Sequence, residues 1–313
     1  MKTKSEMASP LVHIGFPKAG STFLQKRVFI ESNGFHAPWS ISSADAVEAF
    51  IISDGYTFAP EQALSLFKSG MEEAEQKGLR AVISHEYLTG NAFNRDREYY
   101  GYEVSDRILR TFPDAKILLL VREQVSMILS TYQQYVVQGG WYDLSKYLGE
   151  GPRRPGFASQ FNRDFLRYDH VIDRYQSLFG KNSVLVLPLE LLSKNSAEFL
   201  KRLSEFSGVV PIASNVNQVE NAASSAFTVE LRRIYNRFVD TYQDPFVNSY
   251  RIRNRVAGKI RKGSERFVPR EWQERKAKAN HEEVVRVIGD YYSRGNSLAS
   301  EKIGIDLKSF GYQ

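Results

Sequence analysis

The sequence predicts an α/β fold in which a parallel sheet is flanked by helices and a helical, basic part ends the chain. Four short aliphatic runs predict the sheet, because they lack a clean alternation and are typical of strands buried on both faces. Helical stretches separate these runs, and strands that alternate with helices indicate a doubly wound architecture. The predicted strands are Leu11–Ile14, Ala81–Ser84, Ile117–Val121 and Val184–Pro188.

Helices are expected between the strand runs and after them. The pairs Gly139-Gly140 and Gly151-Pro152 interrupt this rhythm, so residues 139–159 are expected to form a surface loop, either a lid or a plain insertion. Residues 222–313 are expected to be helical and basic, without a further strand. The helices predicted before that part are Ser21–Phe29, Ala44–Ser53, Pro60–Lys77, Val104–Thr111, Val125–Gln138, Gln160–Phe179 and Ser196–Ser207.

Composition limits the class of protein. The chain has 313 residues, 42% of them hydrophobic, and no internal repeat, so residues 1–313 are interpreted as one domain with an ample core. It has no cysteine, which excludes disulfides, thiolate catalysis and cysteine-bound metals. Residues 1–10 lack a signal-peptide pattern, and the longest aliphatic run, Ile117–Val121, is too short to cross a bilayer. We expect a cytoplasmic protein without a membrane span.

Charge is spread unevenly along the chain. The net charge is +6, but residues 251–278 alone hold eleven Lys or Arg against three Glu. Such a stretch suits a nucleic acid, an acidic membrane or a small polyanion, or it is simply a solvated basic face. No RNP, zinc-finger or helix-turn-helix pattern accompanies it, so we expect no nucleic-acid partner.

A phosphate-binding loop is predicted directly after the first strand run. Gly15 and Gly20 keep the glycine spacing of the GxxxxGK[ST] loop and lead into the first helix. Backbone N–H groups there point at an anion, Lys18 adds a full charge, and the hydroxyls of Ser21 and Thr22 add donors. Lys18 lies inside the loop, however, and Ser21 stands where that motif has its lysine. The fold class is therefore P-loop-like, with a phosphate loop that differs from the Walker loop.

Two further segments carry groups suited to phosphate. Arg122 directly follows the strand run Ile117–Val121, and Ser130 lies eight residues later on the next helix. An arginine can grip a phosphate through two N–H donors at once, although a strand-end arginine is also a common ion-pair partner. The tripeptide Arg261-Lys262-Gly263 offers two cations and a backbone that an anion can approach closely, but a basic tripeptide is frequent by chance.

A general base is expected at the end of the strand run Ala81–Ser84, where His85 and Glu86 follow. Successive residues that leave a strand point to opposite faces, so one of the two is expected to face the cleft. His13 is expected to pack within the first strand. The other histidines, which are His36, His170 and His281, are expected at the surface or in helices. We find no set of histidines and carboxylates that suits a metal and expect none.

Residues 17–24 resemble the 5′-phosphosulfate loop of sulfotransferases that use 3′-phosphoadenosine-5′-phosphosulfate (PAPS), which has the form Pro-Lys-x-Gly-[Ser/Thr]-[Ser/Thr]-x-Leu. Arg122 and Ser130 are similar to the 3′-phosphate site of this family, although Glu123-Gln124 replaces its usual Asp-Pro. Residues 168–192 and 296–312 resemble its bacterial and carbohydrate-modifying members. The likeness covers most of residues 11–312, with specific motifs only in the loop and at Arg122.

The resemblance implies a role for each of these residues. Lys18, Ala19, Gly20, Ser21 and Thr22 would hold the 5′-phosphosulfate, and Phe23 would offer its ring to adenine unless it packs in the core. Arg122 and Ser130 would hold the 3′-phosphate. Arg261, Lys262 and Gly263 would close over the 3′-phosphate and the adenosine, although the Gly-Asp-Trp-Lys that follows in the family is absent here.

The implied reaction is an in-line transfer of a sulfuryl group from PAPS to an acceptor hydroxyl or amine, without a metal. Cytosolic members use a histidine as the base and many bacterial members a glutamate, which places Glu86 slightly ahead of His85. Trp39, Trp141 and Tyr142 suit a sugar or an aromatic acceptor equally well. We expect a glycan or glycoconjugate, with a small metabolite as the next candidate.

Two other functions stay open. A P-loop nucleotide kinase needs an acidic residue after a neighbouring strand to hold Mg²⁺, and Arg122 at that position opposes it. A non-catalytic protein that binds a nucleotide or a polyanion would use the basic residues 251–278 instead.

Overall fold

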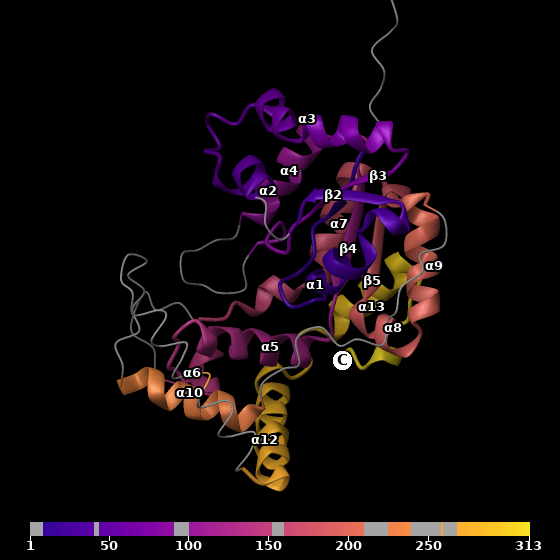
Figure 1. Cartoon of the computed structure of the whole chain (residues 1–313). Coiled ribbons are helices and arrows are strands. Elements are labelled where there is room, and N and C mark those ends of the chain that lie inside the picture. Colours follow the sequence, from indigo (N-terminus) through magenta and orange to yellow (C-terminus); the bar gives the residue numbers. More distant parts are fainter. Residues whose placement is uncertain are drawn as a thin grey trace, which may run out of the picture.

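The computed structural model describes residues 9–40, 44–90, 100–151, 160–209, 225–238, 258 and 268–313. A five-stranded, wholly parallel sheet lies at its centre, in the order β2-β3-β1-β4-β5, and helices flank it (Figure 1). The predicted fold class is therefore confirmed. The strands are β1 (Leu11–His13), β2 (Phe35–Trp39), β3 (Arg80–Ser84), β4 (Lys116–Val121) and β5 (Val184–Pro188).

Strand β1 is the middle strand and pairs with β3 on one side and β4 on the other. Val12 lies opposite Ile83 of β3 and Ile117 of β4. The aliphatic side chains of β1 and β4 are almost completely buried, as the runs without alternation predict. All four predicted strands are present, with ends that differ by at most one residue.

The sequence analysis missed strand β2 at the edge of the sheet. This segment contains Pro38, which cannot donate a ladder hydrogen bond and is tolerated only at an edge or a bulge. The pairing with β3 shifts register between His36 and Trp39. His36 was expected at the surface or in a helix, but it lies on this strand with only 8% of its surface exposed, so that expectation was wrong.

The helices follow the predicted order, with three differences. The predicted helix Gln160–Phe179 begins only at Tyr168, after a 3-10 turn over Arg163–Leu166. Two short helices were missed. Leu144–Tyr147 lies within the expected loop, and Asp143 caps its first turn. Leu189–Lys194 directly follows β5. Residues 152–159 of that loop lie outside the described residues.

The helices are α1 (Ser21–Phe23), extended by a π turn over Leu24–Val28; α2 (Asp45–Val47), extended by a π turn over Glu48–Ile52; α3 (Pro60–Gln76), α4 (Gly101–Thr111), α5 (Gln124–Val137), α6 (Leu144–Tyr147), α7 (Tyr168–Phe179), α8 (Leu189–Lys194), α9 (Ser196–Ser207), α10 (Ala226–Phe238), α12 (Arg270–Ile288) and α13 (Ser293–Ile303). Further 3-10 turns cover Glu31–Asn33, Lys181–Ser183 and Leu307–Phe310.

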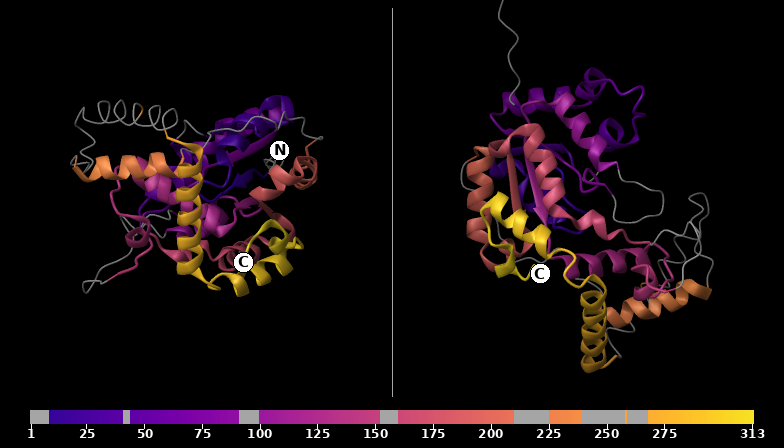
Figure 2. Two further views of the ribbon diagram at one scale, coloured as in Figure 1. Left: turned by 90° about the horizontal axis from the view of Figure 1, so that it is seen from below. Right: turned by 180° about the vertical axis from the view of Figure 1, so that it is seen from behind.

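Some helices pack together beside the sheet, and others form a separate lobe. Helices α3, α4 and α7 pack side by side, and α7 also packs on β4 and β5. Helix α5 leads away from the sheet, and α10 and α12 pack against it as a separate lobe (Figures 1 and 2). Within the part of the chain that the structure describes, no helix is long and apolar enough to cross a membrane.

Candidate active site

The two predicted phosphate-binding segments meet at the carboxyl ends of β1 and β4. After β1 the chain continues to β2 at one edge of the sheet, whereas after β4 it continues to β5 at the other edge. Neighbouring strands whose connections run in opposite directions leave a crevice between their carboxyl ends, which is where open α/β sheets bind ligands. The loop over residues 14–20 and Arg122 line this crevice from its two sides.

Backbone hydrogen bonds hold the loop after β1, one to strand β4 and one within the loop. The Ile14 N–H donates to the Leu118 carbonyl at 3.0 Å, and the Ala19 N–H donates to the Phe16 carbonyl at 3.1 Å. Gly20 precedes α1 with a left-handed φ of 94°. Among the described residues, Lys18 is the non-glycine residue with a positive φ, at 68°.

Two glycines allow this close packing. A Cβ on Gly20 would lie 2.7 Å from Cδ1 of Leu189, at the start of α8. A Cβ on Gly15 would lie 2.9 Å from Nε2 of His13 and 3.0 Å from Oγ of Ser21. Real Cβ atoms do not approach so closely, and both glycines have a positive φ. The predicted glycine spacing therefore has a steric reason at both positions.

Arg122 contacts the loop directly. Its Nη1 donates to the backbone carbonyl of Lys18 at 3.0 Å. The backbone of Arg122 is fixed in turn, because the Tyr168 hydroxyl donates to its carbonyl at 2.6 Å. Burial raises the pKa of Tyr168 well above its ordinary value, so this hydroxyl keeps its proton. The two predicted phosphate sites are thus joined by a hydrogen bond between residues 104 positions apart.

Glu123 caps the helix that follows the turn after β4. Its carboxylate accepts hydrogen bonds from the N–H groups of Val125 at 2.7 Å and Ser126 at 2.8 Å, which caps helix α5. Its own N–H donates to Oε1 of Glu190 at 3.0 Å. Glu123 therefore supplies the cap that an aspartate would, and α5 starts directly after Arg122.

Helix α5 presents a polar face to the loop. Nζ of Lys18 approaches Oε1 of Gln134 at 3.5 Å, the upper limit for a hydrogen bond. Ser130 lies one turn before Gln134, and residues four apart share a helix face. Ser130 is therefore on the side of α5 that Lys18 reaches. Sequence reasoning missed Gln134, because nothing but its spacing from Ser130 distinguishes it.

Glu86 is the candidate base that contacts the loop. Its carboxylate accepts a hydrogen bond from the backbone N–H of Lys18. Burial raises the pKa of Glu86 above its ordinary value, and the charge of Lys18 together with this hydrogen bond offsets part of the rise. His85 contacts other groups: its Nδ1 accepts from the N–H of Tyr87 at 3.3 Å, and burial lowers its pKa.

His13 lies beneath the loop, where Ser84 links its ring to Gln25. Nε2 of Gln25 donates to both the carbonyl and the hydroxyl of Ser84, each at 3.0 Å. The carbonyl can only accept, so the amide orientation is determined, and the Ser84 hydroxyl forms a further hydrogen bond with Nδ1 of His13, 2.8 Å away. Burial lowers the pKa of His13 to about 3, so the ring is neutral.

Nε2 of His13 and the Ser21 hydroxyl are both buried and have no hydrogen-bond partner among the described residues. Both lie within about 3 Å of the point where a Gly15 Cβ would stand. A buried polar group without a partner is costly, and such groups concentrate where a ligand or a water completes them. Ser21 is thus suited to an incoming anion. His13 is confirmed as a packed strand residue.

Other predicted residues lie elsewhere. Phe23 is 8% exposed and belongs to the hydrophobic core. Trp39 is buried and packs on Phe67 with ring centroids 5.3 Å apart, whereas Trp141 is exposed. The predicted contacts of Arg261, Lys262 and Gly263 lie outside the described residues.

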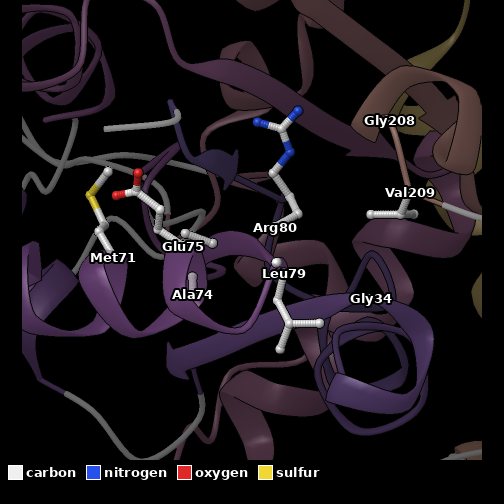
Figure 3. A pocket seen from close by; sticks show the side chains of 10 residues that line it. Gly34, Met71, Ala74, Glu75, Leu79, Arg80, Gly208 and Val209 are labelled. Atoms are coloured by element: carbon white, nitrogen blue, oxygen red, sulfur yellow. The ribbon is translucent and has the colours of Figure 1, made fainter. Parts of the chain in front are cut away.

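A pocket of about 390 Å³ opens at the opposite, amino-terminal edge of the sheet (Figure 3). Glu75 and Arg80 line it, but the Arg80 guanidinium already donates to the carbonyls of Ser207 at 2.9 Å and Ser9 at 2.7 Å. These bonds tie the end of α9 and the start of β1 to β3. We therefore interpret this arginine as structural, and the candidate active site remains at the carboxyl ends of the strands.

No protein-family model matches the chain, and no curated protein sequence matches it. A solved structure, a sulfotransferase from Alicyclobacillus acidocaldarius, superposes with a TM-score of 0.49 and 16% sequence identity. The match covers 78% of this chain and 99% of the other. At this level the likeness carries no conclusion about the activity of the present chain.

Proposed function

We propose that the protein is a PAPS-dependent sulfotransferase of the cytoplasm. The hydrogen bond from Arg122 to the carbonyl of Lys18, at 3.0 Å, carries this proposal. It brings a lysine-containing phosphate loop and a second phosphate-directed arginine to one crevice, as a donor with phosphates at both the 5′ and the 3′ position requires. An ordinary nucleotide needs only the first of these groups.

The donor would be held by residues from three segments. Lys18, the backbone of residues 19–22 and the hydroxyls of Ser21 and Thr22 would bind the 5′-phosphosulfate. The buried, unpartnered hydroxyl of Ser21 fits this role. Arg122 and Ser130 would bind the 3′-phosphate, with Arg261, Lys262 and Gly263 as further contacts to it.

The chemistry follows from these positions. The acceptor oxygen or nitrogen forms a bond to sulfur, and the bond from sulfur to the bridging phosphate oxygen breaks. The electron pair of that bond remains on the phosphate of the leaving 3′-phosphoadenosine-5′-phosphate, where Lys18 and the loop donors stabilise the growing charge. No metal is required in this step, because cations and donors of the chain meet the charge.

Glu86 is the base in this proposal and takes the proton of the acceptor. It contacts the backbone of Lys18, so it lies beside the reacting group, and its raised pKa brings it closer to neutral pH. His85 would orient the turn after β3. The acceptor is a glycan or glycoconjugate hydroxyl, with a small metabolite as the alternative, and the exposed Trp141 offers a stacking surface.

A magnesium-dependent kinase is disfavoured by the residues that follow β4. Such an enzyme holds Mg²⁺ with a carboxylate near this strand end. Arg122 stands there instead, and the carboxylate of Glu123 is engaged by the two N–H groups that it caps, at 2.7 and 2.8 Å.

A transfer assay tests the proposal. The full chain is incubated with PAPS that carries radioactive sulfur and with a panel of glycans, phenols, alcohols and amines. We expect label on at least one class of acceptor and an equal amount of released 3′-phosphoadenosine-5′-phosphate. Lys18→Ala should lower transfer roughly 100-fold or more. Arg110→Ala serves as the control, because this exposed arginine lies at the far end of α4. Phosphoryl transfer from ATP and Mg²⁺, with no use of PAPS, would overturn it.

A further inference from the structure

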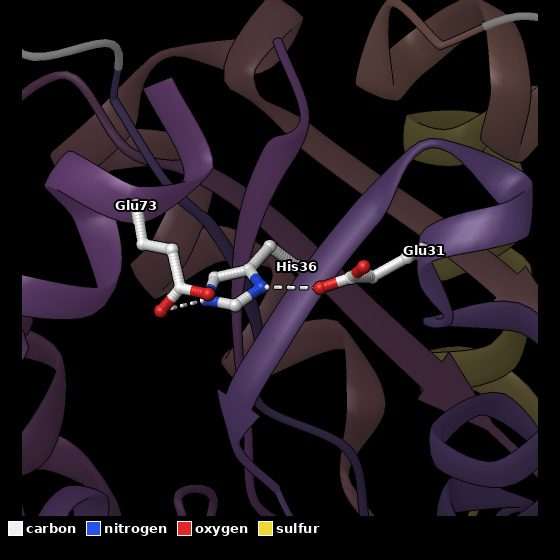
Figure 4. Close-up of side chains that lie close together, drawn as sticks. All are labelled: Glu31, His36 and Glu73. Carbon is white, nitrogen blue, oxygen red and sulfur yellow. Dashed lines mark hydrogen bonds and ion pairs between the residues drawn. The ribbon is translucent and has the colours of Figure 1, made fainter. Parts of the chain in front are cut away.

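Three potential metal ligands lie together at the edge of the sheet, although the sequence suggested no such set. Glu31 from a 3-10 turn, His36 from β2 and Glu73 from α3 each offer one ligand atom, and these atoms lie within 4.8 Å of one another. Figure 4 shows the imidazole of His36 between the two carboxylates. Strand β2 is separated from β1 by β3, so this cluster is distinct from the candidate active site.

His36 lies between two carboxylates, and its Nδ1 is 3.2 Å from Oε1 of Glu31. An ionised carboxylate can only accept, so Glu31 holds the tautomer that has its proton on Nδ1. The lone pair of Nε2 then faces Oε2 of Glu73 at 3.5 Å. Nε2 is buried and has no hydrogen-bond partner among the described residues. In that tautomer two acceptors face each other, and either a proton on Nε2 or a metal ion between them satisfies both.

The separation of 3.5 Å suits a metal ion. Zinc binds histidine nitrogen and carboxylate oxygen at about 2.1 Å, so two such ligands at a tetrahedral angle lie about 3.4 Å apart. A metal-bound histidine usually donates its other N–H to a carboxylate, which fixes the ring. Glu31 is in that position. The arrangement thus combines two ligands with a supporting carboxylate, one protein ligand fewer than catalytic zinc sites use, so water has to fill the other positions.

Lys77 already neutralises part of the cluster without occupying this gap. Its Nζ lies 2.8 Å from Oε1 of Glu31 and 2.7 Å from Oε1 of Glu73. Lys77 uses Oε1 of Glu73, which leaves Oε2 for a metal. Two carboxylates and one ammonium leave a net negative charge.

We propose that Nε2 of His36 and Oε2 of Glu73 bind one Zn²⁺, with Glu31 orienting the imidazole and water completing the coordination. Imidazole with carboxylate oxygen suits zinc better than calcium or magnesium, which prefer oxygen alone. The ion links the edge strand β2 to helix α3. Strand β2 pairs with a neighbour on one side only, and a bulge interrupts that pairing. The ion would attach this strand to α3 as well.

Calorimetric titration of the metal-stripped full chain with zinc chloride at neutral pH tests the proposal. We expect one Zn²⁺ per chain and a rise in the thermal unfolding midpoint, with no comparable response to Mg²⁺ or Ca²⁺. Glu73→Gln should abolish binding, and Glu31→Gln should weaken it roughly tenfold, as loss of a supporting carboxylate does. Glu72→Gln, on the same helix and paired with Lys68, is the matched control.

Lys77→Met gives a test in the opposite direction. Because it removes a neighbouring positive charge, it should tighten zinc binding, whereas a purely structural ion-pair cluster would only lose stability. His36 is buried, so His36→Gln is interpreted only if its circular dichroism matches the wild type. Absence of zinc binding by the wild type, or equal binding by Glu73→Gln, would overturn the proposal. Neither result bears on sulfuryl transfer, which uses other residues.

Discussion

Lys18 is exposed, although its neighbours Pro17 and Ala19 are buried. Its left-handed backbone costs a residue with a Cβ roughly 1 kcal/mol, and such strain is found preferentially at functional sites. The loop accepts this cost and directs the ammonium group toward the polar face of α5, where Gln134 lies 3.5 Å away. We therefore interpret Lys18 as a residue that places a cation in the crevice and not as one that stabilises the fold.

Variants of Lys18 can distinguish the effect of its charge on the reaction from the effect of its backbone conformation on stability. Lys18→Gly keeps the left-handed backbone without strain, so we expect an unchanged or slightly higher free energy of unfolding. Sulfuryl transfer should fall roughly 100-fold or more, because a positioned group at the developing charge is lost. Denaturant unfolding and steady-state rates measure the two effects, with Lys18→Arg as the control that keeps the charge. A Lys18→Gly variant that transfers at the wild-type rate would contradict this role.

Glu86 predicts the pH dependence of the reaction. A base works in its ionised form, so kcat/KM should fall as the pH drops through its pKa. Burial raises the pKa of Glu86, which places this fall above pH 4.5, the ordinary value of such a carboxyl. In Glu86→Gln the fall of kcat/KM at low pH should disappear, and the rate should drop about 100-fold or more. In His85→Gln the fall at low pH should remain. The reverse pattern would identify His85 as the base.

At the scale of elements, the aliphatic strands and the loop after β1 could be predicted, because burial on both faces and glycine spacing leave clear patterns. Strand β2 could not, since Pro38 and a shifted register erase its alternation. The interplay of Lys18 with Gln134 and Glu86 was also beyond the sequence. It depends on how α5 and the turn after β3 approach the loop in three dimensions.

Gly20 lies where the loop packs against Leu189 at the start of α8, so its replacement tests this contact. In Gly20→Ala the new Cβ meets Cδ1 of Leu189, so we expect a loss of about 1–3 kcal/mol in the free energy of unfolding. Gly78 has a φ of 65°, and a Cβ added there would meet no atom within 4 Å. Gly78→Ala therefore measures only the cost of a left-handed backbone for alanine. The double variant Gly20→Ala with Leu189→Ala should recover part of the loss. Equal effects of Gly20→Ala and Gly78→Ala in denaturant unfolding would refute the contact.

At the scale of the whole molecule, the C-terminal segment supports the side of the crevice that carries Arg122. Asn296 of α13 and Gln124 at the start of α5 exchange amide hydrogen bonds of 2.7 and 3.2 Å, and both are buried. The Tyr312 hydroxyl donates to Glu190, which also accepts from the backbone of Glu123. The chain end lies beside α8 and the start of α5 (Figure 1). Residues far apart in sequence thus fix the backbone next to Arg122.

Removing the Asn296 amide tests this support. Asn296→Ala leaves the buried Gln124 without its partner, so we expect a loss of about 1–3 kcal/mol in the free energy of unfolding. Ser297→Ala, the neighbouring residue on the exposed side of α13, is the control. Thermal and denaturant unfolding measure the difference. Similar stabilities of the two variants would mean that the amide pair does not anchor α13.

The central claim is that Arg122 recognises a 3′-phosphate beside the loop that holds the 5′-phosphate. Calorimetric titration of the wild type and Arg122→Ala with 3′-phosphoadenosine-5′-phosphate and with adenosine 5′-phosphate tests it most directly. The wild type should bind the first ligand much more tightly, and Arg122→Ala should lose that preference while its affinity for adenosine 5′-phosphate stays the same. Equal binding of both ligands by the wild type, or an unchanged preference in Arg122→Ala, would contradict the account.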